Sequence, residues 1–179
     1  KYNFIVKDVT KLADVIRRAF RIAQTGRPGP VVIDITKNVT ATKTEYTYKK
    51  PEPIQPDASL IDEIDVEKAV TMIAHSKRPF VFVGGGVTLA NASEELRRFV
   101  KKIDAPVADS LMGKGAFDGT DDSYVGMLGM HGTKAANYGI NQSDLIIVVG
   151  SRFSDRVIGN PKTFGSKAQI LQIDVDASE

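Results

Sequence analysis

Cysteine is absent from the 179-residue sequence, and histidine occurs only twice. The lack of cysteine excludes a disulfide framework, a thiolate metal site and a cysteine nucleophile, and it fits a cytoplasmic protein. No second histidine lies close to His131 in the sequence, so no metal site is indicated. Apolar runs of membrane-spanning length are missing too, and the opening KYNFIVKDVT lacks the pattern of a signal peptide. We therefore expect a cytoplasmic protein with no membrane partner.

Charge of one sign does not dominate either. The 24 Lys and Arg residues nearly balance the 22 Asp and Glu residues, and they are scattered along the chain. This distribution provides no basic surface for nucleic acid, which we exclude as a partner. The apolar share of 42% and the charged share of 26% are those of an ordinary globular protein. The sequence begins inside an apolar run and stops just after a predicted strand, so we expect a segment of a longer protein.

The first 37 residues are predicted to form a helix followed by a strand. Apolar residues at helical spacing indicate a helix over 8–25, with Asp8 as N-cap and Gly26 as C-terminal stop. The unbroken apolar run Val31–Ile35 predicts a strand buried on both faces, as in a parallel sheet. Helix and strand together are typical of the end of a β-α-β unit, too small to fold alone. Residues 1–37 are therefore interpreted as the last piece of a preceding domain.

Residues 38–60 have the proline- and threonine-rich composition of an extended linker. From residue 61 onward, predicted helices and strands alternate. Strands are expected at Phe80–Val83, in PVADS (106–110), in LIIVVG (145–150) and in QILQIDV (169–175). This alternation predicts an α/β fold with a doubly wound, mostly parallel sheet over residues 61–179.

Several features at the ends of these strands favour a bound nucleotide. The stretch GMLGMHGT, Gly126 to Thr133, is too rich in glycine for a helix or a buried strand, and it leads into a helix whose N-terminus could attract phosphate. Gly84–Gly86 follows one strand, Arg152 and Arg156 follow another, and Asp174 ends the last. Ligands bind beyond the carboxyl ends of the strands in such sheets. The conjunction suggests an extended nucleotide lying across the sheet.

Each feature also has an ordinary structural explanation. Gly84–Gly86 lacks the dinucleotide-binding fingerprint and is typical of a tight turn. Met127 and Met130 are more often packing residues than cofactor contacts, and His131 is by default a partly exposed loop residue. Asp155 and Arg156 can simply pair with each other at the surface. The nucleotide interpretation therefore depends on the features occurring together.

A family resemblance emerges from longer blocks of sequence. KYNFIVKDV, TGRPGPVVIDITK, LMGKGAF, LGMHGTKAANY, VGSRFSDRVIG and IDVDASE occur in the same order, and with compatible spacing, as in the large catalytic subunit of acetolactate synthase (acetohydroxyacid synthase). This resemblance covers nearly the whole chain except the linker. It implies that 1–37 end a pyrimidine-binding domain and that 61–179 form most of a Rossmann-like, FAD-binding central domain truncated at its C-terminus.

The resemblance also implies an activity. The family is a thiamine-diphosphate-dependent transferase that condenses pyruvate with a second 2-keto acid, pyruvate or 2-ketobutyrate, with loss of CO₂, in branched-chain amino acid biosynthesis. Thiamine diphosphate and Mg²⁺ (magnesium) are bound by the intact enzyme, and FAD is structural. The intact subunit is expected to be a homo-oligomer, with a regulatory subunit as a further potential partner.

By position, the resemblance implies two sets of site residues. FAD contacts would be Arg27, Gly85, Ser110, Leu111, Leu128, Gly129, Met130, His131, Gly150, Ser151, Arg152, Phe153, Ser154, Asp174 and Val175. The substrate channel would be lined by Lys37, Met130, Asp155 and Arg156, the arginine holding the carboxylate of the second keto acid. Ser154 stands where many relatives have aspartate.

The resemblance places the catalytic machinery outside these residues. The glutamate that activates thiamine belongs before Lys1, and the G-D-G…N motif that holds Mg²⁺ and diphosphate belongs after Glu179. No catalytic residue and no metal ligand is therefore expected here, and the segment is not expected to be active alone. Two alternatives remain: the central domain of another flavin-carrying carboligase, such as glyoxylate carboligase, or a non-catalytic nucleotide-binding module.

Overall fold

The structure, a computed structural model, describes residues 1–54 and 61–176. The chain divides into two compact units, residues 1–60 and 61–179. The end of the predicted linker, residues 55–60, lies outside the described residues, as do residues 177–179 of the IDVDASE block. Each unit has its own sheet.

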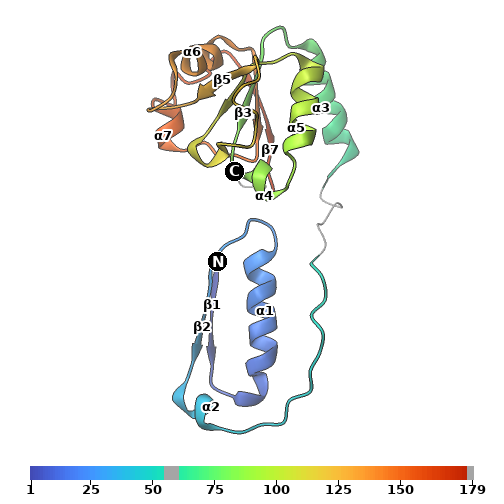
Figure 1. The fold of residues 1–179 in the computed structure, drawn as a ribbon, viewed down its shortest axis with the longest axis vertical. Helices are drawn as coiled ribbons and strands as arrows, with labels where there is room; N and C mark the ends of the chain where they lie inside the picture. The colour runs from blue at the N-terminus through green and yellow to red at the C-terminus, as the bar shows by residue number, and fades with distance from the viewer. Residues whose placement is uncertain (55–60, 177–179) are drawn as a thin grey trace. The chain divides into compact units, whose positions relative to one another are not determined.

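The first unit is a β-α-β arrangement. Its elements are β1 (Tyr2–Val6), a 3₁₀ turn η1 (Val9–Lys11), α1 (Leu12–Gln24), β2 (Val31–Ile35) and α2 (Lys37–Ala41). The two strands pair in parallel, with Phe4 opposite Ile33, and α1 runs beside both (Figure 1). Asp8 caps the first turn as expected, because its carboxylate accepts a hydrogen bond from the Thr10 backbone N–H at 3.0 Å. The predicted helix and strand are confirmed.

Two local expectations for this unit are wrong. Val31–Ile35 is not buried on both faces: in the described unit Val32 is 63% exposed, because the sheet has two strands and α1 covers one side of it. The start of the predicted linker is not extended either. Residues 37–41 form α2, in which Val39 is buried and the Val39 backbone N–H donates to the Thr36 carbonyl at 3.0 Å.

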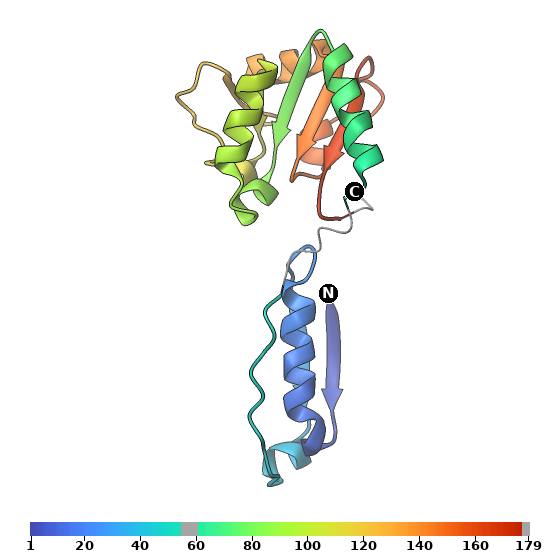
Figure 2. The same ribbon diagram turned by 90° about the vertical axis from the view of Figure 1, so that its right-hand side faces the viewer.

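The second unit is built on five parallel strands in the order β5-β4-β3-β6-β7. The strands are β3 (Pro79–Val83), β4 (Val107–Asp109), β5 (Tyr124–Met127), β6 (Leu145–Val149) and β7 (Gln169–Ile173). The connections contain α3 (Glu63–His75), α4 (Gly85–Leu89), α5 (Ser93–Ile103), a 3₁₀ turn η3 (Leu111–Gly113), α6 (Lys134–Gln142) and α7 (Asp155–Ile158). Figure 2 shows this sheet from the side of α3 and α5.

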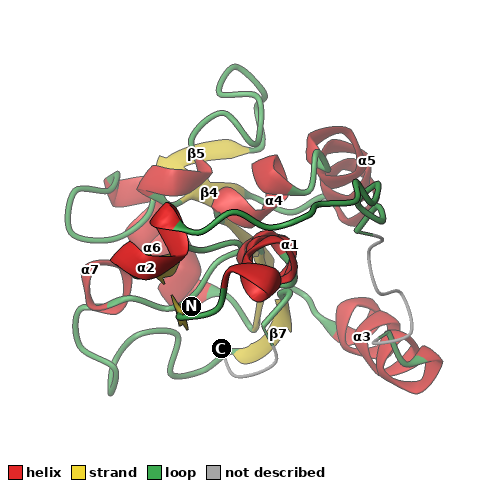
Figure 3. Cartoon of the chain, turned by 90° about the horizontal axis from the view of Figure 1, so that it is seen from below, coloured by secondary structure: helices red, strands yellow, loops and turns green. Residues whose placement is uncertain are grey.

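Both faces of this sheet are covered, which confirms the doubly wound prediction. Figure 3 shows α3 and α5 on one side of the strands and α6 and α7 on the other. Along β3, Val81 and Val83 pack into the core under α5, whereas Phe80 and Phe82 pack into the core under α6. An unbroken apolar run is what a strand buried on both faces requires.

Strand β5 was not expected from its sequence. It includes Gly126 and Met127, the first residues of the glycine-rich stretch, in half-buried positions. The pairing of β5 with β4 shifts register, so that Tyr124 lies opposite Val107 and Gly126 opposite Ala108. Gly126 has a φ of +96°, which glycine adopts without strain, and this irregularity lets a glycine-containing segment pair as an edge strand.

Candidate functional site

The order of the strands creates a switch point between β3 and β6. From β3 the chain moves outward to β4 and β5, and then returns to place β6 on the other side of β3. All five strands are parallel, so their carboxyl ends meet at one edge of the sheet, which we call the carboxyl edge. Clefts at such switch points are the usual ligand sites of open α/β sheets.

The glycines at the switch point pack against each other. A Cβ built on Gly84 would lie 2.2 Å from the carbonyl oxygen of Gly150, and one on Gly86 would lie 2.6 Å from the Gly150 Cα. The Gly86 backbone N–H also donates to the Gly150 carbonyl at 2.9 Å. Gly85, the predicted cofactor contact of this triplet, packs against the η3 turn, with its built Cβ 2.9 Å from the Met112 carbonyl oxygen. Close approach of protein backbone therefore accounts for these glycines.

The glycine-rich stretch is explained in the same way. A Cβ on Gly126 would meet the Thr133 side chain at 2.4 Å, and one on Gly129 would meet the Arg156 carbonyl oxygen at 2.5 Å. Thr133 caps α6 as its Oγ1 accepts from the Ala136 backbone N–H at 3.0 Å. The Asn137 side chain holds Gly129 through hydrogen bonds to its N–H and carbonyl, at 3.1 and 3.0 Å. The stretch thus lies directly against α6 and α7.

Unpaired backbone donors gather in the loop after β6. No described residue accepts a hydrogen bond from the backbone N–H groups of residues 151–155. The loop is anchored on its other side, because the Gln172 side chain donates to the Ser151 carbonyl at 3.2 Å. Ser151 itself is buried. A run of such donors at a switch point can bind an anionic or otherwise oxygen-rich ligand.

Apolar side chains are exposed at the same edge. Leu111 after β4, Met130 after β5 and Val175 after β7 are 71%, 64% and 60% exposed. Together with the backbone amides after β6, which have no acceptor among the described residues, they form a surface suited to an extended ligand with both apolar and oxygen-rich parts.

The structure places the predicted cofactor contacts of the second unit along this one edge. Gly85 follows β3, Ser110 and Leu111 follow β4, and Leu128, Gly129, Met130 and His131 follow β5. Gly150, Ser151, Arg152, Phe153 and Ser154 follow β6, and Asp174 and Val175 follow β7. The remaining contact, Arg27, lies in the first unit, between α1 and β2. The parallel sheet alone therefore brings together residues that are 90 positions apart in sequence, from Gly85 to Val175.

The predicted channel residues divide between the units. In the second unit, the Met130 backbone N–H donates to the Arg156 carbonyl at 2.9 Å, which places Met130 beside Asp155 and Arg156. The Arg156 Nε lies 3.8 Å from Asp155 Oδ2, and both side chains are largely exposed. This is the surface pair that the sequence allowed, and it stabilises the fold little. Lys37 begins α2 in the first unit.

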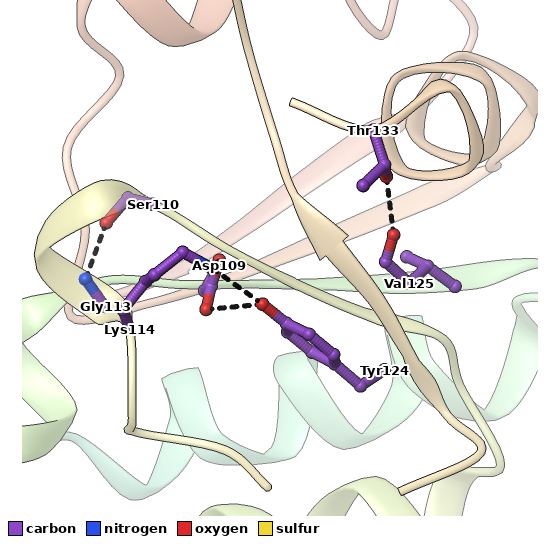
Figure 4. A network of polar contacts seen from close by, with 7 residues as sticks. All are labelled: Asp109, Ser110, Gly113, Lys114, Tyr124, Val125 and Thr133. Carbon is purple, nitrogen blue, oxygen red and sulfur yellow. Dashed lines mark hydrogen bonds and ion pairs between the residues drawn. The ribbon is translucent and has the colours of Figure 1, made fainter. Parts of the chain in front are cut away.

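A polar cluster at the carboxyl end of β4 was missed by the sequence analysis. The buried carboxylate of Asp109 accepts a hydrogen bond from the Tyr124 hydroxyl at 2.8 Å and lies 3.5 Å from Lys114 Nζ (Figure 4). The hydrogen bond with Tyr124 and the nearby Asp109 carboxylate raise the pKa of Lys114, and burial raises the pKa of Tyr124. The sequence did contain a signal for this cluster: an acidic residue ends an apolar strand, and a lysine follows it five positions later.

Metal and membrane features are not seen in the described part of the chain. Residues 1–54 and 61–176 contain no group of three or more His, Cys, Asp or Glu side chains that could hold a metal ion. None of the helices described is both long enough and apolar enough to cross a membrane.

Comparison with known proteins places the chain in a family. Residues 66–179 match the model described as "Thiamine pyrophosphate enzyme, central domain". The chain is 41% identical over its full length to a protein named probable acetolactate synthase large subunit from Methanococcus aeolicus, and 43% identical to acetolactate synthase 2, chloroplastic, from Nicotiana tabacum. It covers 31% and 27% of those proteins, about a third of their length or less. These alignments include the linker, which the resemblance read from the sequence had left out.

A solved structure shares the fold. The structure described as "X-ray structure of a putative thiamin diphosphate-dependent enzyme isolated from Mycobacterium smegmatis" superimposes with a TM-score of 0.75 at 22% sequence identity. The match covers 99% of this chain and 34% of that one. With more than half of its residues matching the central-domain model, the chain belongs to the thiamine pyrophosphate enzyme family.

Proposed function

We propose that this chain is part of the catalytic subunit of an acetolactate synthase, an enzyme that condenses pyruvate with a second 2-keto acid and releases CO₂. The observation that carries the proposal is the identity of 41–43% to proteins of that name from an archaeon and a plant, over the whole chain. In this proposal residues 1–37 are the end of the pyrimidine-binding domain, residues 38–60 are the linker between the domains, and residues 61–179 belong to the central domain.

FAD is the ligand that we propose for the carboxyl edge. The donor set fits it: the amides of residues 151–155, without an acceptor in the described part of the chain, suit the oxygen-rich part of a dinucleotide, and the Asp174 carboxylate just after β7 suits ribose hydroxyls. Exposed Leu111, Met130 and Val175 offer apolar contact. Arg27 is the remaining contact that the resemblance implies. FAD bound here would be structural, because the condensation involves no net redox change.

The residues beside this edge would orient the second substrate. A guanidinium can hold a keto-acid carboxylate through two parallel hydrogen bonds, and Arg156 has an exposed side chain with only a weak partner in Asp155. Met130 would supply an apolar wall next to it. Lys37 is the remaining channel residue that the resemblance implies. Thiamine diphosphate, which other parts of the intact enzyme would hold with Mg²⁺, would supply the nucleophilic carbon for decarboxylation and ligation. We further propose a cytoplasmic homo-oligomer, with or without a regulatory subunit.

The full-length protein that contains this chain provides the test. It should be purified and assayed for acetolactate formation from pyruvate, with thiamine diphosphate, Mg²⁺ and FAD supplied, and the flavin that copurifies should be quantified. We expect acetolactate and stoichiometric FAD. Product from glyoxylate with none from pyruvate would instead support the related carboligase. Flavin without any ligation would support a nucleotide-binding module.

A further inference from the structure

The cluster of Asp109, Lys114 and Tyr124, which we call the Asp109 cluster, connects two segments of the carboxyl edge. The Tyr124 hydroxyl donates to Asp109 Oδ2 at 2.8 Å and accepts from Lys114 Nζ at 3.1 Å. Lys114 Nζ also lies 3.5 Å from Asp109 Oδ1 and 5.8 Å from the centre of the Tyr124 ring. Figure 4 shows the three side chains converging between β4 and β5. Each member therefore touches both others.

Asp109 and Lys114 close the turn that carries two predicted cofactor contacts. Asp109 ends β4, Ser110 and Leu111 follow it, and Lys114 comes directly after η3. Within the turn, the Gly113 backbone N–H donates to Ser110 Oγ at 3.1 Å. The turn also rests on the neighbouring strand, because the Ser110 N–H donates to the Val83 carbonyl at 2.8 Å. The ion pair thus joins the two ends of a turn whose middle is exposed.

The same residues fix the segment after β5. Tyr124 is the first residue of β5, and the Asp109 carbonyl accepts from the Leu128 backbone N–H at 2.9 Å, just past the end of that strand. Asp109 therefore contacts β5 near both of its ends, with its side chain at one and its main chain at the other. The predicted contacts Leu128–His131 begin at the second of these points.

The energetics favour a role in positioning over one in stability. The Asp109 side chain is 4% exposed and the Lys114 side chain 52%, so burying the carboxylate costs desolvation free energy while solvent weakens its attraction to the lysine. Such a cluster does penalise alternative arrangements, because moving the turn would take Lys114 away from the buried carboxylate and slipping β5 would take Tyr124 away. The tyrosine hydroxyl has one proton, so donating to Asp109 while accepting from Lys114 leaves a single satisfied geometry.

We propose that Asp109, Lys114 and Tyr124 are positioning residues that hold Ser110–Leu111 and Leu128–His131 in the arrangement that binds FAD. This inference rests on the proposed function. It makes the affinity for FAD depend on three side chains that belong to neither set of predicted contacts.

Tyr124→Phe in the full-length protein tests the inference, because it removes the bridging hydroxyl and keeps the ring. Ser76→Ala is the matched control: the Ser76 hydroxyl also donates to a carboxylate, that of Asp144, at the opposite edge of the same sheet. Hydrogen exchange measured without FAD should be faster in Tyr124→Phe at the hydrogen-bonded amides 113 and 128–130, roughly fivefold, for the loss of about one net hydrogen bond. The dissociation constant of FAD, from fluorescence titration of the apoprotein, should rise roughly three- to tenfold. Ser76→Ala should change neither.

Lys114 provides a second pair of variants with less risk to the fold, since its side chain is half exposed. Lys114→Met should weaken FAD binding as Tyr124→Phe does. Lys114→Arg keeps a cationic donor and should weaken FAD binding less than Lys114→Met. Unchanged exchange at both segments in Tyr124→Phe would overturn the positioning role. An equal loss of FAD affinity in Ser76→Ala would overturn it too, since general destabilisation would then be the cause.

The outcomes also separate this inference from the proposed function. If the wild-type protein binds no FAD, the proposed cofactor site fails, and the link to FAD affinity fails with it. The exchange experiment needs no cofactor and still decides whether the Asp109 cluster holds the two segments. Faster exchange with unchanged FAD affinity would overturn the inference and leave the proposed function standing.

Discussion

Replacing Gly84 by alanine should strongly destabilise the second unit, because the switch point has no room for a methyl group. A Cβ at this position would lie 2.2 Å from the Gly150 carbonyl oxygen, 2.5 Å from the Ser151 Cβ and 2.6 Å from the Ser151 Cα. Real Cβ atoms essentially never approach other heavy atoms within 3.0 Å. Gly84 cannot retreat easily, since its backbone N–H donates to the Val149 carbonyl at 2.9 Å.

The size of the effect follows from what would have to move. Overpacking a close-packed site typically costs about 1–3 kcal/mol. The atoms in the way belong mostly to the main chain that follows β6, whose residues 145–148 are almost fully buried. A flexible side chain could rotate away, but this backbone moves only together with the strand. We therefore expect Gly84→Ala to lower the free energy of unfolding by about 3 kcal/mol, the upper end of that range.

Urea unfolding of the 179-residue chain, followed by far-UV circular dichroism and by hydrogen exchange within β6, measures the effect. With a slope of about 2 kcal/mol per molar urea, the midpoint should fall by about 1.5 M. Gly119→Ala is the control, because its Cβ would make an ordinary contact of 3.7 Å with the Tyr124 ring, and it should shift the midpoint by less than about 0.3 M. A shift for Gly84→Ala as small as that of the control would refute the reasoning.

Two further predictions concern charged groups. In the intact enzyme, Arg156→Lys keeps the positive charge but loses the two-point hydrogen bond to the carboxylate of the second keto acid. Use of that keto acid in steady-state assays should therefore fall roughly ten- to a hundredfold, while the FAD content changes little. Unchanged rates would identify Arg156 as only the surface partner of Asp155. Hydrogen bonds from the Ser76 hydroxyl and from the backbone N–H groups of Lys77 and Arg78 lower the pKa of Asp144 from 3.8 to about 2. The ionised Asp144 carboxylate therefore stabilises the fold fully above about pH 4, and this contribution is lost as the pH falls towards 2. Asp144→Asn should lower the midpoint of urea unfolding at pH 7 and make that midpoint decline less between pH 4 and pH 2. A decline as steep as that of the wild-type protein would contradict this assignment.

The helices and strands with strong local signals were predictable. The apolar runs of β3 and β6 predicted strands, and the structure places both inside the sheet, buried on both faces. The apolar run of β2 predicted a strand buried on both faces, yet Val32 is exposed, because the described sheet of the first unit has one covering helix. A local pattern records which side chains can be buried. Whether a second layer covers them is a property of the assembled fold.

The candidate site was predictable in its position and only partly in its chemistry. Parallel strands bring their carboxyl ends to one edge, so the predicted contacts after β3 to β7 had to lie together once the alternation of helices and strands was recognised. The glycines were a weaker guide. Gly84 and Gly129 contact Gly150 and Arg156, residues far away in sequence, and such contacts leave no trace in the local pattern.

The sequence by itself determined the alternation of helices and strands, the parallel sheet and the edge at which a ligand can bind, because hydrophobic periodicity and strand direction are local properties that repeat along the chain. Tertiary structure alone decided which strands became neighbours, and with them the pairing of Asp109 with Tyr124 across a register shift. It also decided that backbone packing occupies the glycines of the switch point while the amides of residues 151–155 have no partner among the described residues. The physical reason is that a hydrogen bond or a close contact depends on where two distant segments meet.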